Sequence, residues 1–487
     1  MAVVAAVDQG TTGTRSLVVD ESSAVLGEAY ATHEQIYPRP GWVEHDPREI
    51  FECVLETLEE AVAAAGVSAA DLAAIGVTNQ RETTVLWEAD SGDPVHNAIV
   101  WQDRRTTERV ATLEGEWIRE RTGLEPDAYF SASKLEWLLE RVEDPRGLRA
   151  GTIDSWLIEQ LTGVHVTDVT NASRTMLFDI HECAWDEELL ETFGVPRSVL
   201  PTVRPSSDPT PYGHTDPDGP LGAAVPVTAA IGDQQAALFG QACFEPGSAK
   251  NTYGTGSFLL TNTGTDPVDS EHGLLTTVAM QCGADPVEYA LEGSIFATGA
   301  AVEWLVDMGL LEDPGESGDM AATVDSTDGV YVVPAFTGLG APHWDGRARG
   351  TVVGITRGTR PAHLVRATLE AVAFQTRDVL EAMEADADVD IDVLRVDGGA
   401  VSNDVLCSLQ ADLLGRTVER PRMTETTGLG TAYAAGLAVG VWEDRGEITA
   451  SRRVDRHFEP SLDSETADSR HTRWREAVER SLGWARE

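Results

Sequence analysis

The sequence predicts an α/β protein made of two duplicated halves with a catalytic cleft between them, and three observations support this fold class. The chain has 487 residues, enough for two large domains or roughly three ordinary ones. Short apolar runs typical of strands alternate with helical patterns. A strand, a turn rich in glycine and threonine, and a second strand occur near the start of the chain and again at 250–260.

The first half is expected to contain strands, one long helix and further strands. The predicted strands are 3–8, 16–19, 24–30, 75–78 and 84–87. The helix should begin at Asp46, a capping residue followed by Pro47 in the first helical position and by Glu49 as the acid of a capping box. Apolar residues then recur every fourth position until Gly66, which should end the helix.

The second half repeats this alternation from residue 227 onward. The predicted strands are 227–231, 250–253, 257–260 and 394–397, and the predicted helices are roughly 295–308, 361–385 and 428–440. Gly240, Pro246 and Gly247 interrupt the pattern between the halves. We therefore expect domains at 1–241 and 242–487, with the proline-rich stretch 201–226 as an excursion on the first.

The charge balance limits the partners this chain can have. Its 36 basic residues minus its 81 acidic residues give a net charge of -45, which disfavours nucleic acid and anionic membrane surfaces. Apolar residues still make up 42% of the chain, so a folded protein is expected. Only Lys134 and Lys250 are lysines. A folded, acidic, lysine-poor chain indicates adaptation to concentrated salt, where charge repulsion is screened; acidic drift in composition is the alternative.

Several negative features point to a cytoplasmic protein. The chain contains no run of 18 apolar residues and no basic, signal-like start, so neither a membrane helix nor a secretory leader is expected. The five cysteines form no CxxC pair, which disfavours a zinc site or a disulfide framework.

The two glycine- and threonine-rich turns are candidate phosphate sites. The first runs from Asp8 to Arg15, and the second from Tyr253 to Ser257. Glycine lets a backbone approach a ligand closely, while amides and hydroxyls can donate to phosphate oxygens. Asp8 ends a buried strand and suits Mg²⁺ held through water. An ordinary hairpin turn explains either segment alone; their recurrence favours a shared phosphate chain.

Two polar segments that follow strands are candidates for the chemistry. Asp233 comes after a strand and before a helical run, which suits either a general base or a helix N-cap. Arg81 and Glu82 could share a site for a vicinal diol only if the chain turns there, because neighbours in a strand point to opposite faces. A surface ion pair is the alternative for these two residues.

Further candidates lie beside turns or strand ends. Trp101, Tyr129 and Phe258 could line a ligand or belong to the core. Gly398 and Gly399 follow a strand and precede a helix, which suits either a nucleotide packed on bare backbone or a tight turn.

Ten segments together resemble the glycerol-phosphorylating members of the FGGY carbohydrate kinases. They are DQGTTGTRS, EQIYPRPGWVEHDP, GVTNQRETTVLW, NAIVWQDRRT, VTDVTNASRTMLF, GDQQAALFGQ, NTYGTGSF, YVVPAFTGLGAPHWD, VRATLEAVAFQTRDVLEAM and LRVDGGAVSND. The resemblance is strong over about 3–440. It implies two duplicated ribonuclease H-like (actin-like ATPase) domains, transfer of a phosphoryl group from ATP to glycerol with Mg²⁺, and a homodimer or homotetramer.

The same resemblance assigns roles to residues. The glycerol-binding residues would be Arg81, Glu82, Trp101, Tyr129, Asp233, Gln234 and Phe258, with Asp233 catalytic. The ATP- or ADP-binding residues would be Thr11, Thr12, Gly13, Arg15, Thr255, Gly299, Glu303, Gly399 and Asn403. Asp8 and Asp233 would lie near the metal.

Three differences from the family qualify this assignment. Ala128 replaces the proline that precedes Tyr129, and Glu303 replaces a glutamine of bacterial members, which leaves its nucleotide contact open. The segment 219–224 has no arginine, so inhibition by fructose 1,6-bisphosphate is not expected. Two alternatives remain: a kinase of the same family for another polyol or ketose, such as dihydroxyacetone or xylulose, and a non-catalytic ATP-dependent switch of actin-like fold.

Overall fold

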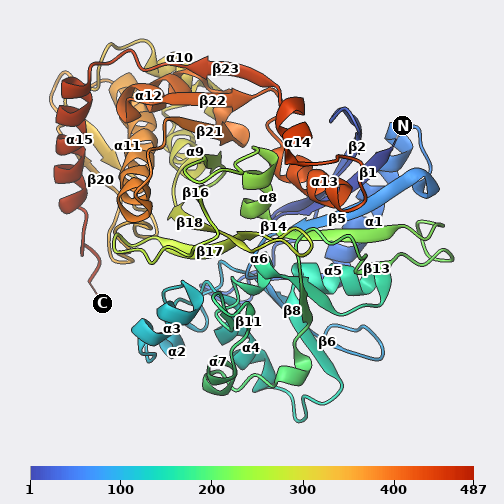
Figure 1. The fold of residues 1–487 in the computed structure, drawn as a ribbon. Helices are drawn as coiled ribbons and strands as arrows, with labels where there is room; N and C mark the ends of the chain where they lie inside the picture. Colours follow the sequence, from blue (N-terminus) through green and yellow to red (C-terminus); the bar gives the residue numbers. More distant parts are fainter. Residues whose placement is uncertain (1, 487) are drawn as a thin grey trace.

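In the computed structural model, which describes residues 2–486, the chain forms two α/β halves (Figure 1). The first sheet has the strand order β13 (Gly213–His214), β14 (Pro226–Gly232), β5 (Leu72–Asn79), β1 (Val3–Gln9), β2 (Gly13–Asp20) and β3 (Val25–Thr32). The second has the order β17 (Leu275–Met280), β18 (Glu288–Ile295), β16 (Ser257–Gly264), β15 (Ala249–Tyr253), β21 (Val393–Asp397), β22 (Thr417–Pro421) and β23 (Val454–Phe458).

The pairing of these strands shows the duplication. In the first sheet, β1 pairs antiparallel with β2 and parallel with β5, which pairs parallel with β14. In the second sheet, β15 pairs antiparallel with β16 and parallel with β21, which pairs parallel with β22. Each half also has a long helix in the chain before the parallel partner of its first strand. This helix is α1 (Pro47–Ala65), before β5, in the first half and α11 (Pro361–Ala387), before β21, in the second. The predicted duplicated α/β fold is confirmed.

The predicted helices lie close to their expected positions. The remaining helices are α2 (Thr107–Val110), α3 (Gly115–Thr122), α4 (Ser131–Leu139), α5 (Ile153–Thr162), α6 (Val169–Ala172), α7 (Glu187–Thr192), α8 (Asp233–Gly240), α9 (Gly299–Asp307), α10 (Ser317–Ala321), α12 (Asp404–Leu414), α13 (Thr426–Ala438), α14 (Arg445–Ser451) and α15 (Ser464–Glu479). Helix α9 begins later than expected because β18 continues to Ile295, which pairs with Ser257. Among residues 2–486, no helix has the length and apolar character to cross a bilayer.

The start of α1 shows which local signals act as predicted. The Asp46 side chain accepts a hydrogen bond from the Arg48 amide at 2.9 Å, and the helix ends at Gly66, whose φ of 69° is left-handed. The predicted capping box does not form. The Glu49 carboxylate instead accepts from the amide of Glu34 at 3.1 Å, which ties α1 to the segment after β3.

Helices α8 and α13 cross where the two halves meet. A Cβ atom on Gly240 would lie 2.1 Å from the Thr426 carbonyl oxygen, and one on Gly430 would lie 2.0 Å from that of Ala236. Only glycine permits such a close crossing. Helix α13 also packs on the first sheet, where Leu429 belongs to the same apolar cluster as residues of β1 and β2. The domain boundary at 241 and 242 stays a prediction.

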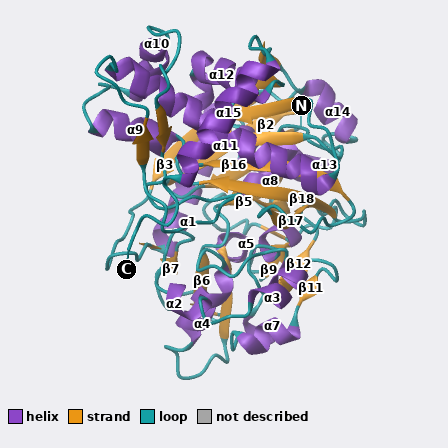
Figure 2. Ribbon diagram, turned by 90° about the vertical axis from the view of Figure 1, so that its left-hand side faces the viewer, coloured by secondary structure: helices purple, strands orange, loops and turns teal. Residues whose placement is uncertain are grey.

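A large part of the first half is inserted between β5 and β14, and the views agree that helices α2, α3, α4 and α7 lie together at one end of the molecule (Figures 1 and 2). Its strands β7 (Ala98–Ile99), β6 (Thr84–Glu88) and β8 (Leu148–Thr152) form a sheet whose other edge is β4 (Glu44–His45), a strand that precedes β5, in the order β4, β7, β6, β8. Its short strand pairs are β9 (Val166–Asp168) with β12 (Thr202–Arg204), and β10 (Phe178–Asp179) with β11 (Ala184–Trp185). In the second half, β19 (Tyr331–Val333) pairs with β20 (Thr351–Val353). The predicted excursion at 201–226 supplies β12 to the pair with β9 and β13 to the edge of the six-stranded sheet, where it pairs with β14.

Candidate active site

Arg81 and Glu82 follow β5 at a sharp turn of the backbone. Glu82 has a φ of 62°, in the left-handed region, and the amide of Thr83 donates to the Arg81 carbonyl at 2.7 Å. Such a conformation is strained for a glutamate and is typical of functional sites. It is the turn that a shared site for these two side chains requires. Arg81 and Glu82 are 2% and 1% exposed, so they are not a surface ion pair.

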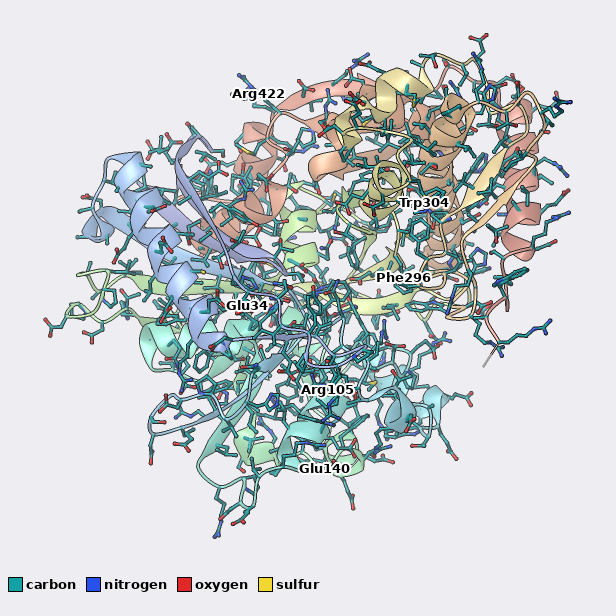
Figure 3. All side chains as sticks on the ribbon, turned by 180° about the vertical axis from the view of Figure 1, so that it is seen from behind. Glu34, Arg105, Glu140, Phe296, Trp304 and Arg422 are labelled. Atoms are coloured by element: carbon teal, nitrogen blue, oxygen red, sulfur yellow. The ribbon has the colours of Figure 1, made fainter. Side chains whose placement is uncertain are left out.

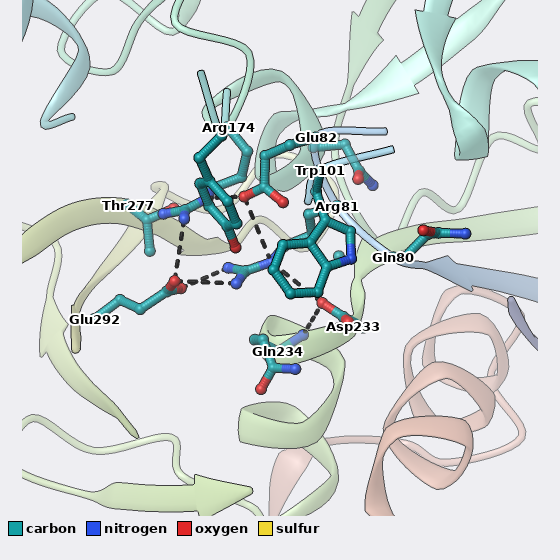
Figure 4. A network of polar contacts seen from close by, with 12 residues as sticks. Gln80, Arg81, Glu82, Trp101, Arg174, Asp233, Gln234, Thr277 and Glu292 are labelled. Atoms are coloured by element: carbon teal, nitrogen blue, oxygen red, sulfur yellow. Dashed lines mark hydrogen bonds and ion pairs between the residues drawn. The ribbon is translucent and has the colours of Figure 1, made fainter. Parts of the chain in front are cut away.

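Arg81 and Glu82 belong to a buried group of alternating charges that also contains Arg174 and Glu292, here called the charge centre (Figure 4). Arg81 donates to both oxygens of Glu292, at 2.5 Å and 3.0 Å. Arg174 donates to Glu292 at 3.0 Å and to Glu82 at 2.7 Å. Since Glu292 lies on β18 and the other three residues lie in the first half, the charge centre joins the two halves.

The two carboxylates of the charge centre differ: the arginines keep Glu292 ionised, whereas burial raises the pKa of Glu82 against the opposing charges of Arg81 and Arg174. Burial alone would raise the pKa of Glu292, but Arg174 and Arg81 outweigh it and hold that pKa at about 2. Glu82 uses its Oε1 atom for Arg174, while its Oε2 atom has no hydrogen-bond donor among residues 2–486. The charge centre thus fixes Arg81 and leaves one oxygen of Glu82 able to accept from a ligand.

Asp233 lies at the first position of α8, beside the charge centre. Its Oδ1 atom is 3.2 Å from the Nε atom of Arg81 and accepts from the amide of Gln234 at 2.8 Å. Gly232, rather than Asp233, occupies the N-cap position. The Asp233 side chain is 26% exposed, while that of Arg81 is 2% exposed. Burial raises the pKa of Asp233, against the opposing effects of Arg81 and Lys250. A partly exposed carboxylate with a raised pKa suits a general base.

The three predicted aromatic residues are half-buried, and their rings lie against Arg81, Arg174 or one another. The rings of Trp101 and Tyr129 meet edge to face, with centroids 5.5 Å apart. The ring of Phe258 lies under the Arg81 guanidinium, 5.9 Å from its Cζ atom. Gln234 is buried and accepts from the Lys250 ammonium at 2.6 Å. These contacts connect the seven residues to one another or to the charge centre, and their role in glycerol binding stays a prediction.

The segment around β4 contacts the segment 97–106, which carries Trp101, through a second buried ionic group. The Arg105 side chain, labelled in Figure 3, pairs with Asp103 at 2.8 Å and with Glu44 at 2.7 Å. Its Cζ atom also lies 3.8 Å from the ring centroid of Trp42. These contacts join the segment around β4 to the segment that carries Trp101, and they are almost fully buried. This second buried ionic group therefore lies a few positions after Trp101 and ties its segment to β4.

The first turn joins β1 and β2. The amide of Gly10 donates to the Gly13 carbonyl at 2.9 Å, and the indole of Trp101 donates to the Thr11 hydroxyl at 2.9 Å. Thr12 is exposed. Arg15 is partly exposed and pairs with Glu28, and its Nε atom lies 3.5 Å from Glu425. The hydroxyl of Thr11 thus couples the predicted phosphate turn to a predicted wall of the glycerol pocket.

The second turn joins β15 and β16 and meets two other predicted nucleotide segments. The amides of Thr298 and Gly299 donate to the Thr255 and Gly254 carbonyls at 2.9 Å and 3.0 Å. A Cβ atom on Gly299 would lie 2.7 Å from the Gly254 carbonyl oxygen, and one on Gly398 would lie 2.4 Å from the Tyr253 carbonyl oxygen. Thr255 itself is exposed. The backbone alone therefore brings the start of α9, the second turn and the end of β21 together.

Three further predicted nucleotide residues lie near this junction but differ in exposure and in hydrogen bonding: Glu303, Gly399 and Asn403. Glu303 is exposed on α9, and Gly399 is exposed directly after β21. The Asn403 side chain caps α12, accepting from the amide of Leu406 at 3.1 Å, and donates to Ser317 at 3.1 Å. The nucleotide contacts expected of these three residues stay predictions.

Asp8 and Asp233 are close enough to influence one another. Burial is the main cause that raises the pKa of Asp8 to about 7, and the charges of Asp233 and Glu425 raise it further. A divalent cation would relieve this repulsion, and carboxylate oxygens are ligands that Mg²⁺ prefers. Within residues 2–486 no three potential metal ligands gather. The two carboxylates therefore fit a magnesium ion that takes its other ligands from water and phosphate.

The sequence does not single out three residues of this site. Arg174, Glu292 and Lys250 are buried, and each meets a partner that is distant along the chain. One signal was available for Glu292, an acid inside the buried stretch of β18, whereas the other acid of that strand, Glu288, lies at its first position. A buried charge in such a strand needs a partner.

The duplicated sheets, the two glycine turns and a partly exposed aspartate fixed by a buried arginine define a two-domain kinase of the actin-like ATPase class. Residues 3–240 match the N-terminal domain of the FGGY family of carbohydrate kinases, and residues 249–439 match its C-terminal domain. The chain belongs to this family.

Among its relatives, "Glycerol kinase" of Halobacterium salinarum is 61% identical, covering 100% of this chain and 99% of that protein. "Glycerol kinase 2" of Thermotoga maritima is 54% identical, covering 99% of each chain. The crystal structure of Plasmodium falciparum glycerol kinase with ADP superimposes with a TM-score of 0.93 at 37% identity, covering 99% of this chain and 98% of that one.

Proposed function

We propose that the chain transfers the γ-phosphoryl group of ATP to glycerol, giving sn-glycerol 3-phosphate and ADP. The observation that carries the proposal is Asp233, a partly exposed carboxylate 3.2 Å from an arginine that is itself clamped by Glu292. The full-length identity of 61% to "Glycerol kinase" of Halobacterium salinarum supports this substrate. The reaction belongs to glycerol catabolism in the cytoplasm.

Each group has a defined part in this reaction. Arg81 donates to the glycerol hydroxyls and Glu82 accepts from them, while Trp101, Tyr129 and Phe258 enclose the carbon chain. Asp233 accepts the proton of the reacting hydroxyl. The oxygen of that glycerol hydroxyl then forms the new bond to the γ-phosphorus as the bond to the leaving ADP oxygen breaks. Positioning and charge stabilisation supply most of the rate enhancement in such transfers.

The nucleotide is held from both halves. Thr11, Thr12, Gly13 and Arg15 meet its phosphates from the first turn, and Thr255 meets them from the second. Gly299, Glu303, Gly399 and Asn403 surround the nucleoside. Asp8 and Asp233 would hold Mg²⁺, which would neutralise phosphate charge. Closure of the two halves excludes water, which would otherwise compete with glycerol as the acceptor.

A coupled ADP-release assay in concentrated KCl tests this function. The wild-type protein should turn over ATP with glycerol and much less with dihydroxyacetone or xylulose, and chiral analysis should give the sn-3 product. Preference for a ketose would assign another substrate, and rapid turnover without any acceptor would indicate an ATP-dependent switch. Sedimentation of the same preparation should give a homodimer or homotetramer. Because the 219–224 segment offers no arginine, fructose 1,6-bisphosphate should not inhibit.

A further inference from the structure

Both lysines of this chain are buried, as are only a few of its arginines, such as Arg81 and Arg174. Of the 36 basic residues only Lys134 and Lys250 are lysines, and they are 1% and 0% exposed. Positive charges on the surface are therefore carried by arginine. A lysine ammonium directs three donors from one compact atom, whereas the arginine guanidinium is a planar fork. We therefore asked which acceptors surround each of the two buried ammonium groups.

Lys134 holds the loop that carries Tyr129. Its Nζ atom donates to three successive carbonyl oxygens that precede or begin α4: those of Ala128 at 2.8 Å, Tyr129 at 2.5 Å and Phe130 at 3.0 Å. Three carbonyls that converge on one atom fix the path of the backbone at Tyr129. The Tyr129 ring in turn faces Trp101.

Lys250 holds the opposite side of the same pocket. It lies on β15, and its Nζ atom donates to the Gln234 side chain at 2.6 Å, to the Phe258 carbonyl at 3.2 Å and to the Thr252 hydroxyl at 2.9 Å. Gln234 follows Asp233 on α8, in the first half, whereas Phe258 lies on β16, in the second. One ammonium thus joins two pocket residues from different halves.

Both ammonium groups are costly to bury. Burial lowers the pKa of Lys134 to about 7 and that of Lys250 to about 8. The charges facing Lys134 are those of Glu82, Asp103 and Asp127, with Arg104 opposing, and those facing Lys250 are Asp397, Glu292 and Asp233, with Arg81 opposing. An apolar side chain of similar size is often at least as stabilising at a buried position. Because each ammonium has three acceptors, we looked for a positioning role rather than a contribution to overall stability.

We propose that Lys134 and Lys250 are positioning residues for the polyol pocket, Lys134 fixing Tyr129 and Lys250 fixing Gln234 and Phe258. Neither side chain needs to touch the substrate. The proposal rests on the function proposed above, because it takes the pocket around Asp233 to be the glycerol site. It also explains why lysine is present at these two positions of an otherwise arginine-only chain.

Steady-state kinetics of Lys134→Met and Lys250→Met test the proposal. Each variant should raise the KM for glycerol by roughly 10-fold, the size expected when a charge-assisted hydrogen bond is lost, and should change the KM for ATP by less than about twofold. Lys250→Met should also lower kcat, because Gln234 adjoins Asp233. Lys134→Gln and Lys250→Gln, which keep a donor, should fall between wild type and the methionine variants.

Asp154→Asn is the matched control. Asp154 is as buried as either lysine and accepts from Thr152 and Thr167, outside the pocket. It should lower the melting temperature without changing the KM for glycerol. The proposal is overturned if folded lysine variants keep the wild-type KM for glycerol, or if their KM values for glycerol and ATP rise together. The glutamine variants serve the same test if the methionine variants do not fold. Wild-type turnover with glycerol tests the proposed function separately, and the comparison between variants can be run with whichever polyol the wild type accepts.

Discussion

The charge centre and the two glycine turns are held in place by different kinds of contact. The charge centre consists of side chains at most 2% exposed, joined across as many as 211 positions of the chain. In the turns, Thr12 and Thr255 are exposed and the hydrogen bonds between backbone groups set the geometry. The first region is fixed before a ligand arrives, while the second presents backbone and hydroxyl donors that a phosphate can order. Substitutions in the two regions should therefore have separable effects on glycerol and ATP.

Removing the charge of Asp233 should have the largest effect. Asp233→Asn keeps the size of the side chain and its bond with the Gln234 amide but removes its basicity. We expect kcat to fall by roughly 10²–10⁴, the range for a positioned acid–base group. The melting temperature should change little, and glycerol binding should remain measurable by calorimetry. Turnover close to wild type in a folded protein would remove Asp233 from the mechanism.

Arg81→Ala should give the next largest effect, and it should be confined to glycerol. The loss in kcat/KM for glycerol should be about 2–4 kcal/mol, as for a truncated charged donor. The structure identifies Glu292 as the carboxylate that loses its bidentate partner, whereas Glu82 keeps Arg174. The variant should therefore also melt at a lower temperature. A comparable loss in KM for ATP would contradict the separation of the two regions.

Thr255→Ala tests the other region and should have a smaller effect. One hydrogen bond from an exposed hydroxyl contributes about 0.5–1.5 kcal/mol, so the KM for ATP should rise by roughly 2- to 10-fold. Because Thr255 is exposed, the melting temperature should not change, and glycerol binding by calorimetry should match wild type. If glycerol binding weakens as much as ATP binding, the turn and the charge centre are not independent.

Salt should stabilise the whole protein but have little effect on the charge centre. Activity and melting temperature should rise between about 0.1 and 2 M KCl, because screening relieves the repulsion of a net charge of -45. The stability difference between wild type and Arg81→Ala should change by less than about 0.5 kcal/mol over that range, since salt screens buried pairs far less than exposed charges. A melting temperature independent of salt would overturn the salt adaptation inferred from the composition.

The sequence predicts the fold better than it predicts the site. Strands such as β1 and β5 and helix α1 follow from local signals: apolar periodicity, Asp46, Pro47 and Gly66. The sequence could say only that Arg81 and Glu82 share a site if the chain turns between them. It could not predict the turn itself, because a left-handed glutamate is held by the surrounding tertiary structure. The partners of Arg81 were unpredictable for a similar reason. Glu292 lies 211 positions away, and only the pairing of β18 with β16 brings it to the charge centre.

The burial of both lysines has a practical consequence for chemical labelling. Reagents that acylate amines should leave Lys134 and Lys250 unmodified in the folded protein, so conventional coupling through lysine side chains offers no attachment points on its surface. Any acyl group that appears at either position would mark a local opening of the structure. Mass spectrometry of the modified peptides could then report how tightly one side of the pocket or the other stays closed, without an added probe.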